Sequence, residues 1–173
     1  MSAKYEFVPG DTITIAPGRT LKRIRALATI AVAGVAPGNL GGYVESEANL
    51  AQVCGDAWVS GDARVSGDAR VSGDARVSGD AWVSGDARVS GDGLIFWASK
   101  VGNENGTITV YNAKDNTLYV TRGCFSGTPE QFLAASEEKH DARTRHEYKL
   151  LIEVATSRIE AARAALAETE ASE

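Results

Sequence analysis

Residues 55–92 read GDAWVSGDARVSGDARVSGDARVSGDAWVSGDARVSGD, a single hexapeptide repeated in which Trp replaces Arg at positions 58 and 82. Each repeat places a valine two residues after an alanine. Because residues two apart share a face of a strand, Ala and Val are predicted to point inward and the intervening Arg or Trp outward. Gly-Asp then supplies a corner, since Gly tolerates positive φ and Asp can bond its local backbone. The period of six is typical of a parallel β-helix.

The hexapeptides resemble those of the left-handed β-helix family over about residues 40–107, including the continuation through Ile95 and Val101. That resemblance implies coils of three hexapeptides, about 18 residues each, and assembly as a homotrimer. The predicted fold is therefore mainly β: a left-handed parallel β-helix with a strand-rich N-terminal cap and a C-terminal β-hairpin plus two helices.

The flanking sequence suggests four segments. Residues 1–43 contain short β-prone runs broken by Pro-Gly and are predicted to cap the β-helix of residues 44–107. Residues 108–167 form the C-terminal module: ITVYNAKDNTLYVTRG (108–123) predicts the hairpin, Thr128 and Gln131 form a capping box that starts a helix, and a second helix is expected over about 146–167. Residues 168–173 are predicted to be a disordered tail.

Composition limits the classes of function. The net charge of −5 over 173 residues argues against binding of duplex nucleic acid, which depends on Lys and Arg contacts to phosphates. We find no signal-peptide pattern and no apolar run near the roughly 20 residues that span a bilayer, so we expect a soluble cytoplasmic protein without membrane contact. Cys54 and Cys124 make neither a metal spacing nor a disulfide framework. No cofactor is predicted.

The outward residues of the repeat form columns if positions 18 apart stack. Trp58 then lies over Arg76, Arg64 over Trp82, and Arg70 over Arg88. Two interpretations remain open: a face that packs against another subunit, or a place where Trp and Arg bind an aromatic anion such as a nucleotide. An intersubunit pocket would satisfy both. The corner residues form similar columns, such as Asp62 over Asp80, which either bond their own turns or hold a cation.

Catalysis of the kind known for β-helix enzymes is not expected. The acyltransferases that the repeat resembles use a histidine on the coils or on a loop extruded from them as general base. The coils of this chain contain no histidine, since His140 and His146 both follow the repeat, and their spacing does not match a zinc site at a trimer interface. An acyltransferase with an unrecognised base remains a third hypothesis.

The flanks offer two candidate anion sites. Arg23 and Arg25 share a strand face and either bind phosphate or pair with Asp or Glu of a neighbouring subunit. Arg122 precedes the sequence GCFSGT, and Ser126 and Thr128 add hydroxyls where a helix is predicted to start. A helix N-terminus favours anions, although an ordinary loop-to-helix junction explains the same residues.

The whole chain resembles small proteins of bacteriophages and prophages. The resemblance rests on NLGGYVESEANL (39–50), the GDA-type repeats and GCFSGT (123–128). Some phage proteins of similar design act as sponges for the nucleotide signals of bacterial defence. This analogy suggests a non-enzymatic protein that sequesters a small anionic nucleotide-like ligand, of the cyclic nucleotide or ADP-ribose type. The alternative is a structural or host-protein interaction module.

The hypothesis of a ligand-binding protein names twelve candidate residues. They comprise aromatic residues that could stack a base, arginines that could hold phosphate, and two hydroxyls: Trp58, Trp82, Trp97, Tyr111, Arg23, Arg25, Arg64, Arg76, Arg88, Arg122, Ser126 and Thr128.

Overall fold

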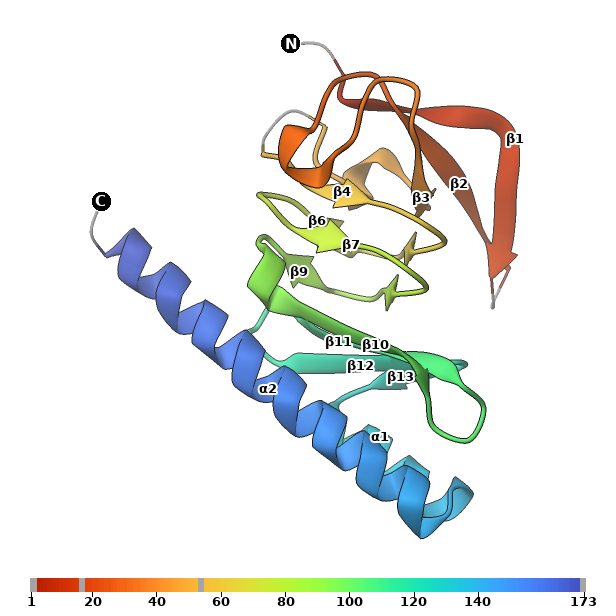
Figure 1. Cartoon of the computed structure of the whole chain (residues 1–173), viewed down its shortest axis with the longest axis vertical. Helices are drawn as coiled ribbons and strands as arrows, with labels where there is room; N and C mark the ends of the chain where they lie inside the picture. The colour runs from red at the N-terminus through yellow and green to blue at the C-terminus, as the bar shows by residue number, and fades with distance from the viewer. Residues whose placement is uncertain (1–2, 16–17, 53–54, 172–173) are drawn as a thin grey trace. The chain divides into compact units, whose positions relative to one another are not determined.

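The computed structural model describes residues 3–15, 18–52 and 55–171 of the 173-residue chain. The chain divides into two compact units, Met1–Asp92 and Gly93–Glu173, which Figure 1 colours from red to green and from green to blue. The first unit contains the repeats, and the second contains the hairpin and the helices.

The first unit begins with a long antiparallel hairpin. Strands β1 (Tyr5–Ile15) and β2 (Arg19–Ala26) pair with a register shift between Phe7 and Thr12. A short 3₁₀ turn, η1 (Ala31–Ala33), leads to β3 (Leu40–Val44), which pairs with β2 and then, in parallel, with the first coil. The predicted strand-rich cap is therefore continuous with the sheet of the repeats.

The repeats form six two-residue strands that pair in parallel. They follow the 3₁₀ turn η2 (Glu47–Asn49) and are β4 (Trp58–Val59), β5 (Arg64–Val65), β6 (Arg70–Val71), β7 (Arg76–Val77), β8 (Trp82–Val83) and β9 (Arg88–Val89). β4 pairs with β7, β5 with β8 and β6 with β9, so the predicted columns of outward residues are confirmed. Tyr43 and Leu50 instead pair with Arg64 and Val71, each 21 residues later, so the three extra residues of the first coil lie between Leu50 and Trp58.

The inward positions are also confirmed. The Ala and Val side chains of the described repeats are at most 1 % exposed: Ala57, Ala63, Ala69, Ala75, Ala81 and Ala87, with Val59, Val65, Val71, Val77, Val83 and Val89. Burial of each valine contributes roughly 1.5–3 kcal/mol of hydrophobic free energy. The stability of the solenoid therefore comes from stacked small side chains.

The solenoid ends earlier than the sequence predicted. The first unit stops at Asp92, and after the 3₁₀ turn η3 (Asp92–Leu94) residues Ile95–Val101 form β10, which pairs antiparallel with β11 (Gly106–Asn112). The reason lies at the corners. The corner glycines from Gly55 to Gly85 have positive φ, but Gly91 does not, and the next corner position holds Trp97, which cannot readily adopt such a φ.

The second unit is an antiparallel sheet covered by two helices. Strands β10 (Ile95–Val101), β11 (Gly106–Asn112), β12 (Leu118–Arg122) and β13 (Phe125–Gly127) pair in that order, which confirms the predicted hairpin. Helix α1 (Pro129–Lys139) starts at the predicted capping box, in which the Gln131 backbone N–H donates to Thr128 Oγ1 (3.3 Å) and the Thr128 N–H donates to Gln131 Oε1 (2.9 Å).

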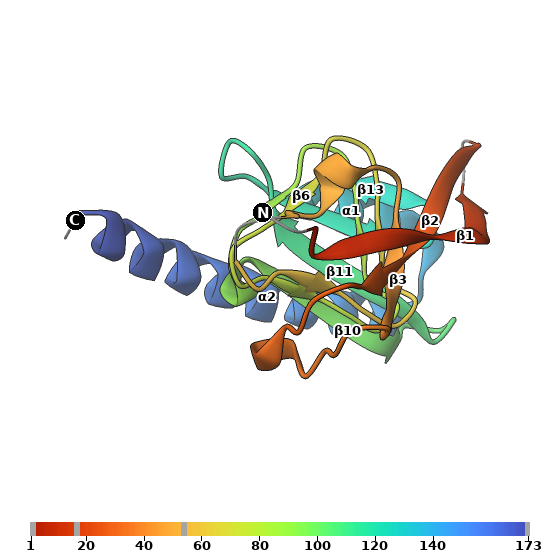
Figure 2. The ribbon, with the colours of Figure 1, turned by 90° about the horizontal axis from the view of Figure 1, so that it is seen from above.

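Helix α2 (Ala142–Glu170) is longer than predicted. It is capped by Asp141, whose carboxylate accepts from the Thr144 backbone N–H at 2.7 Å. Its expected apolar stripe is buried, with Tyr148, Ala155 and Ile159 all 0 % exposed. Figure 2 shows its C-terminal part extending past the sheet of its unit, where residues 164–169 are exposed. The helix continues to Glu170, so residues 168–170 are not the disordered tail that was predicted.

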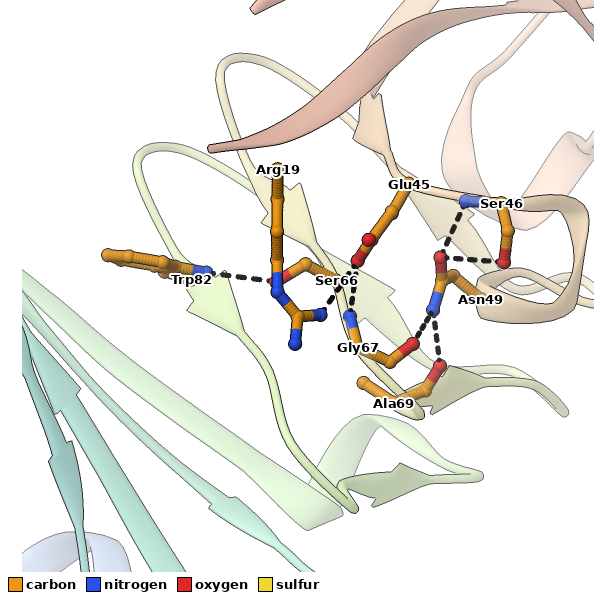
Figure 3. Close-up of polar contacts among 8 residues, drawn as sticks. All are labelled: Arg19, Glu45, Ser46, Asn49, Ser66, Gly67, Ala69 and Trp82. Carbon is orange, nitrogen blue, oxygen red and sulfur yellow. Dashed lines mark hydrogen bonds and ion pairs between the residues drawn. The ribbon is translucent and has the colours of Figure 1, made fainter. Parts of the chain in front are cut away.

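Polar side chains of Glu45 and Asn49 bond to the backbone of the coil that follows (Figure 3). Asn49 is 1 % exposed, and its Nδ2 donates to the carbonyls of Gly67 and Ala69, both at 2.9 Å. Glu45 Oε2 accepts from the Gly67 backbone N–H at 2.7 Å and from Arg19 Nη1 at 3.0 Å. These bonds tie β3 and η2 to the coil that follows.

Glu45 gives the solenoid a pH dependence. The Gly67 N–H bond, followed by the bond and charge of Arg19, lowers the pKa of Glu45 below its ordinary value of 4.5 against the opposing effect of burial. A lowered folded-state pKa stabilises the fold above the unfolded pKa, and this contribution is lost as the pH falls through the folded pKa. We expect Glu45→Gln to reduce the free energy of unfolding by roughly 0.5–1.5 kcal/mol at neutral pH.

Urea unfolding of wild type and Glu45→Gln at neutral pH and at about pH 3 measures this contribution. The difference between the two proteins should shrink in acid. Glu47→Gln, on the exposed turn η2, is the control and should change stability little at either pH. An undiminished difference in acid would mean that the charge of Glu45 does not matter.

Candidate functional site

The tryptophan side chains of the solenoid pack against other parts of the first unit. Trp58 is 3 % exposed, and a Cβ added to Gly41 would lie 2.8 Å from its ring. Trp82 is half-buried and packs against the cluster of Ile15, Leu21 and Tyr43, while its Nε1 donates to Ser66 Oγ at 3.4 Å. Trp58 therefore offers no open face on which a base could stack, and Trp82 is partly covered.

The solenoid arginines lie beside these tryptophans, as the columns predicted. Arg64 pairs in register with Trp82 and is exposed, whereas Arg76 and Arg88 are half-buried. Arg88 Nη1 donates to the carbonyls of Asp68 (2.7 Å) and Ala87 (2.9 Å). The columns therefore bring charge and aromatic rings together without forming an aromatic platform.

Arg23 and Arg25 pair with acidic side chains of the same chain. Arg23 Nε lies 3.0 Å from Asp11 Oδ2, its Nη2 donates to the Tyr43 hydroxyl at 2.8 Å, and its guanidinium stands 4.2 Å from the centre of that ring. Arg25 Nε donates to Glu6 Oε1 at 2.8 Å. These ion pairs form within one chain, whereas the sequence interpretation placed them with a neighbouring subunit.

The aromatic candidates of the second unit, Tyr111 and Trp97, differ in burial. Tyr111 is 0 % exposed, and its ring stacks on Tyr119 with centres 6.5 Å apart. Trp97 is half-buried on β10, opposite Thr109. Tyr111 is thus closed to a ligand.

A pocket of about 430 Å³ lies between the β12–β13 end of the sheet and α1. Arg122, Cys124 and Phe125 line it from the strands and the loop that joins them, and Phe132, Lys139 and His140 line it from the helix. The pocket combines cationic and aromatic side chains of one unit.

Arg122 is the unusual side chain of this pocket. It is 10 % exposed, and its Nη1 lies 3.4 Å from Glu104 Oε2 on the exposed β10–β11 turn. Within the described ranges, its buried Nε and Nη2 have no hydrogen-bond partner. A buried donor without a partner costs free energy, more so when it is charged, so a ligand that satisfies these atoms gains affinity.

The sheet explains how Arg122 comes to be buried. It is the last residue of β12, paired with Ile108 on one side and Phe125 on the other. Its guanidinium occupies the space that a side chain at Gly106 would fill, since a Cβ there would lie 2.5 Å from Arg122 Cζ. The glycine at the start of β11 therefore makes room for the arginine.

On the helix side, polar and aromatic side chains four residues apart line the pocket. His140 Nδ1 lies 3.0 Å from the hydroxyl of Ser136, which is 2 % exposed, and the His140 ring meets Tyr148 edge to face at 5.4 Å. Phe132 stands one turn earlier and is 4 % exposed. The spacing of four residues places these side chains on one face of α1.

The predicted site and the observed pocket share Arg122 but differ in position. The Thr128 hydroxyl is used as the helix cap, and Ser126 is exposed and does not line the pocket. The pocket runs along the side of α1 toward its C-terminal end, not at its N-terminus. Sequence reasoning missed Glu104, Phe132, Lys139 and His140; the four-residue spacing of Phe132, Ser136 and His140 was the available signal.

Two other expectations concern metals and thiols. In the part of the chain that the structure describes, no three His, Cys, Asp or Glu side chains gather as a metal site. Cys124 is an exposed free thiol at the pocket, and Cys54 lies outside the described residues.

None of the helices among the described residues is long and apolar enough to cross a membrane.

The parallel stacking of hexapeptide strands with buried Ala and Val defines a β-solenoid repeat protein. A family model described as the YdcK β-solenoid repeat matches residues 51–67 and 69–85, so this part of the chain is similar to that repeat. No curated protein and no solved structure matches the chain.

Proposed function

We propose that this β-solenoid protein binds and sequesters a small phosphorylated, nucleotide-like ligand without converting it. The observation that carries the proposal is the Arg122 guanidinium, which is nine-tenths buried at a pocket and has unpartnered Nε and Nη2. Arginine binds phosphate through paired N–H donors, and burial strengthens such bonds. Lys139 at the same pocket adds a second positive charge.

We further propose that the protein acts in the cytosol of a bacterial host and assembles as a homotrimer. The resemblance to phage proteins supports a role in trapping a cyclic nucleotide or ADP-ribose-type signal of bacterial defence, in the cytosol of the host. The 18-residue pairing of the coils supports a left-handed solenoid, and the resemblance to that family supports a homotrimer. A sponge removes only as many molecules as it has sites, so it must bind tightly and be abundant.

A second candidate function is a module that binds a host protein. The observation in its favour is the set of apolar side chains on α2 that are exposed: Leu150 (48 %), Val154 (50 %) and Leu166 (41 %). Single exposed apolar residues are common on protein surfaces, however. This alternative also gives no role to the buried guanidinium of Arg122.

A depletion experiment tests the proposed function. The purified full chain is incubated with cyclic mono-, di- and trinucleotides, cyclic ADP-ribose isomers and inorganic phosphate, and the free ligand is measured before and after heat denaturation. We expect one of the nucleotides to be depleted and then recovered intact. Recovery of a changed molecule would indicate an enzyme, and depletion of none would overturn the proposal in favour of a protein-binding module.

Glu104 should weaken ligand binding. Its carboxylate is 71 % exposed and lies 3.4 Å from Arg122 Nη1, where it offsets the charge that attracts an anion. We expect Glu104→Gln to raise the affinity for the bound ligand several-fold, because removal of a rim charge of the same sign as the ligand favours association. Isothermal titration at low and moderate salt measures this, and the gain should fall as salt increases. An affinity lowered by the substitution would show that Glu104 orders the site instead.

A further inference from the structure

The two unpartnered nitrogens of Arg122 belong to one edge of its guanidinium. Nε and Nη2 point their N–H groups in parallel, while Glu104 contacts the remaining nitrogen, Nη1. Two parallel N–H donors match two oxygens of a single phosphate or carboxylate group. The ion pair and an anionic ligand can therefore occupy the same guanidinium at different positions.

Access to this edge depends on exposed segments. Glu104 lies in the exposed turn between β10 and β11, and Gly123 and Cys124 form an exposed loop tip between β12 and β13. Both segments border the guanidinium and neither belongs to a strand. The rim of the pocket beside Arg122 is therefore built from a turn and a loop rather than from strands.

The charge of the pocket sets the charge of the ligand. Arg122 and Lys139 contribute two positive charges and Glu104 one negative charge, which leaves one net positive charge. A phosphodiester carries about one negative charge and two free oxygens, whereas a phosphomonoester carries about −1.5 to −2 at neutral pH. With Glu104 in place, the pocket matches the diester.

The pocket also has aromatic side chains, Phe132 on α1 and Phe125 on β13. Phe132 is 4 % exposed and is fixed edge to face between Phe125 (5.2 Å between ring centres) and Tyr148 (5.1 Å). Phe125 is half-buried and also lines the pocket, so part of its side chain faces the cavity. Bases stack on such rings with little dependence on sequence.

The volume limits the size of the ligand. About 430 Å³ is near the lower end of the roughly 300–1,000 Å³ range of small-molecule pockets. One base, one sugar and one phosphate fit this space better than a cyclic di- or trinucleotide.

We infer that the pocket binds a cyclic mononucleotide, with its phosphodiester on the Nε and Nη2 edge of Arg122 and its base against Phe125. This inference rests on the proposed function and names the class of ligand within it. Phe125 is a specificity-determining residue in this arrangement, and Glu104 selects for a singly charged phosphate.

Titrations of the full chain with 3′,5′-cyclic AMP, 3′,5′-cyclic GMP, 5′-AMP, cyclic di-AMP and inorganic phosphate test the inference. We expect one cyclic mononucleotide to bind at least about tenfold more tightly than 5′-AMP or cyclic di-AMP. Phe125→Leu should weaken that nucleotide by roughly 5- to 100-fold, the range expected for loss of one stacking ring, and leave inorganic phosphate unchanged. Glu104→Gln should shift the preference toward 5′-AMP.

The outcomes separate this inference from the proposed function. Binding of 5′-AMP or cyclic di-AMP as tightly as the cyclic mononucleotides would overturn the inference while leaving a nucleotide-binding protein. An affinity unaffected by Phe125→Leu, with the variant folded by circular dichroism, would overturn the placement of the base. Failure of all five probes to bind would overturn the inference, whereas the wider depletion panel decides the proposed function.

Discussion

Alanine at Gly73 should destabilise the solenoid far more than alanine at Gly85. Both glycines stand in the same hexapeptide, VSGDAR, and both have positive φ, +59° and +64°. At Gly73 an added Cβ would lie 2.0 Å from the carbonyl oxygen of Ser90 in the next coil, whereas at Gly85 no described atom lies within 4 Å. A left-handed conformation costs alanine roughly 1–2 kcal/mol at either site, and the clash adds roughly 1–3 kcal/mol at Gly73 alone.

Urea unfolding of the two variants measures the difference. Because the local sequence and backbone conformation are matched, the residual difference in the free energy of unfolding reports the contact between stacked coils. We expect a loss of roughly 2–5 kcal/mol for Gly73→Ala and roughly 1–2 kcal/mol for Gly85→Ala. Equal losses would show that the coil containing Ser90 moves aside without cost.

Much of the solenoid could be predicted because its period is encoded locally. The alternation of Ala, an outward residue and Val identifies the buried face, and Gly-Asp identifies each corner. The end of the repeat was harder to predict, since Ile95 and Val101 preserve the six-residue spacing. The signal in the sequence is Trp97 at a corner position, although the corner conformation is already lost at Gly91.

The fate of the outward tryptophans could not be read from the repeat. Strand alternation correctly places Trp58 and Trp82 on the outside of the coils. It does not show what covers that surface, and the β1–β2 hairpin and Gly41, which precede the repeat, supply the cover. A ring outside a coil is not necessarily a ring in solvent.

The candidate site was predictable in residue type but not in geometry. Arg122 was identified from its position before a glycine-bearing loop. Its unpartnered edge depends on Gly106, Glu104 and the side of α1, which the antiparallel register brings to the end of β12. Such placement depends on tertiary packing. The local sequence GCFSGT therefore predicted an anion site at the N-terminus of α1, whereas the pocket lies along the side of the helix.

Methionine at Arg122 should abolish ligand binding without destabilising the protein. The side chain is 10 % exposed and has two unpartnered donors, so its burial opposes folding unless an anion is bound. Methionine fills a similar space without charge, and loss of the Glu104 ion pair costs about 0–1 kcal/mol because Glu104 is 71 % exposed. We expect the free energy of unfolding to change by less than about 1 kcal/mol or to increase.

The loss of binding should be large. Removal of one partner of a buried charged hydrogen-bonded pair costs about 2–5 kcal/mol, which corresponds to a roughly 30- to 4,000-fold weaker affinity. Arg122→Lys retains the charge but not the two parallel donors, so we expect it to recover only part of the affinity. Arg158→Met removes the same charge from an exposed position on α2 and should leave binding unchanged.

Stability and binding together distinguish a binding arginine from a structural one. An arginine kept for the fold would lose stability when replaced, and any loss of binding would follow from unfolding. An arginine kept for a ligand should lose binding alone, because natural sites retain buried charge that the fold itself does not need. If Arg122→Met unfolds the second unit while Arg158→Met does not, the guanidinium is a structural element of the sheet, and the proposed site is wrong.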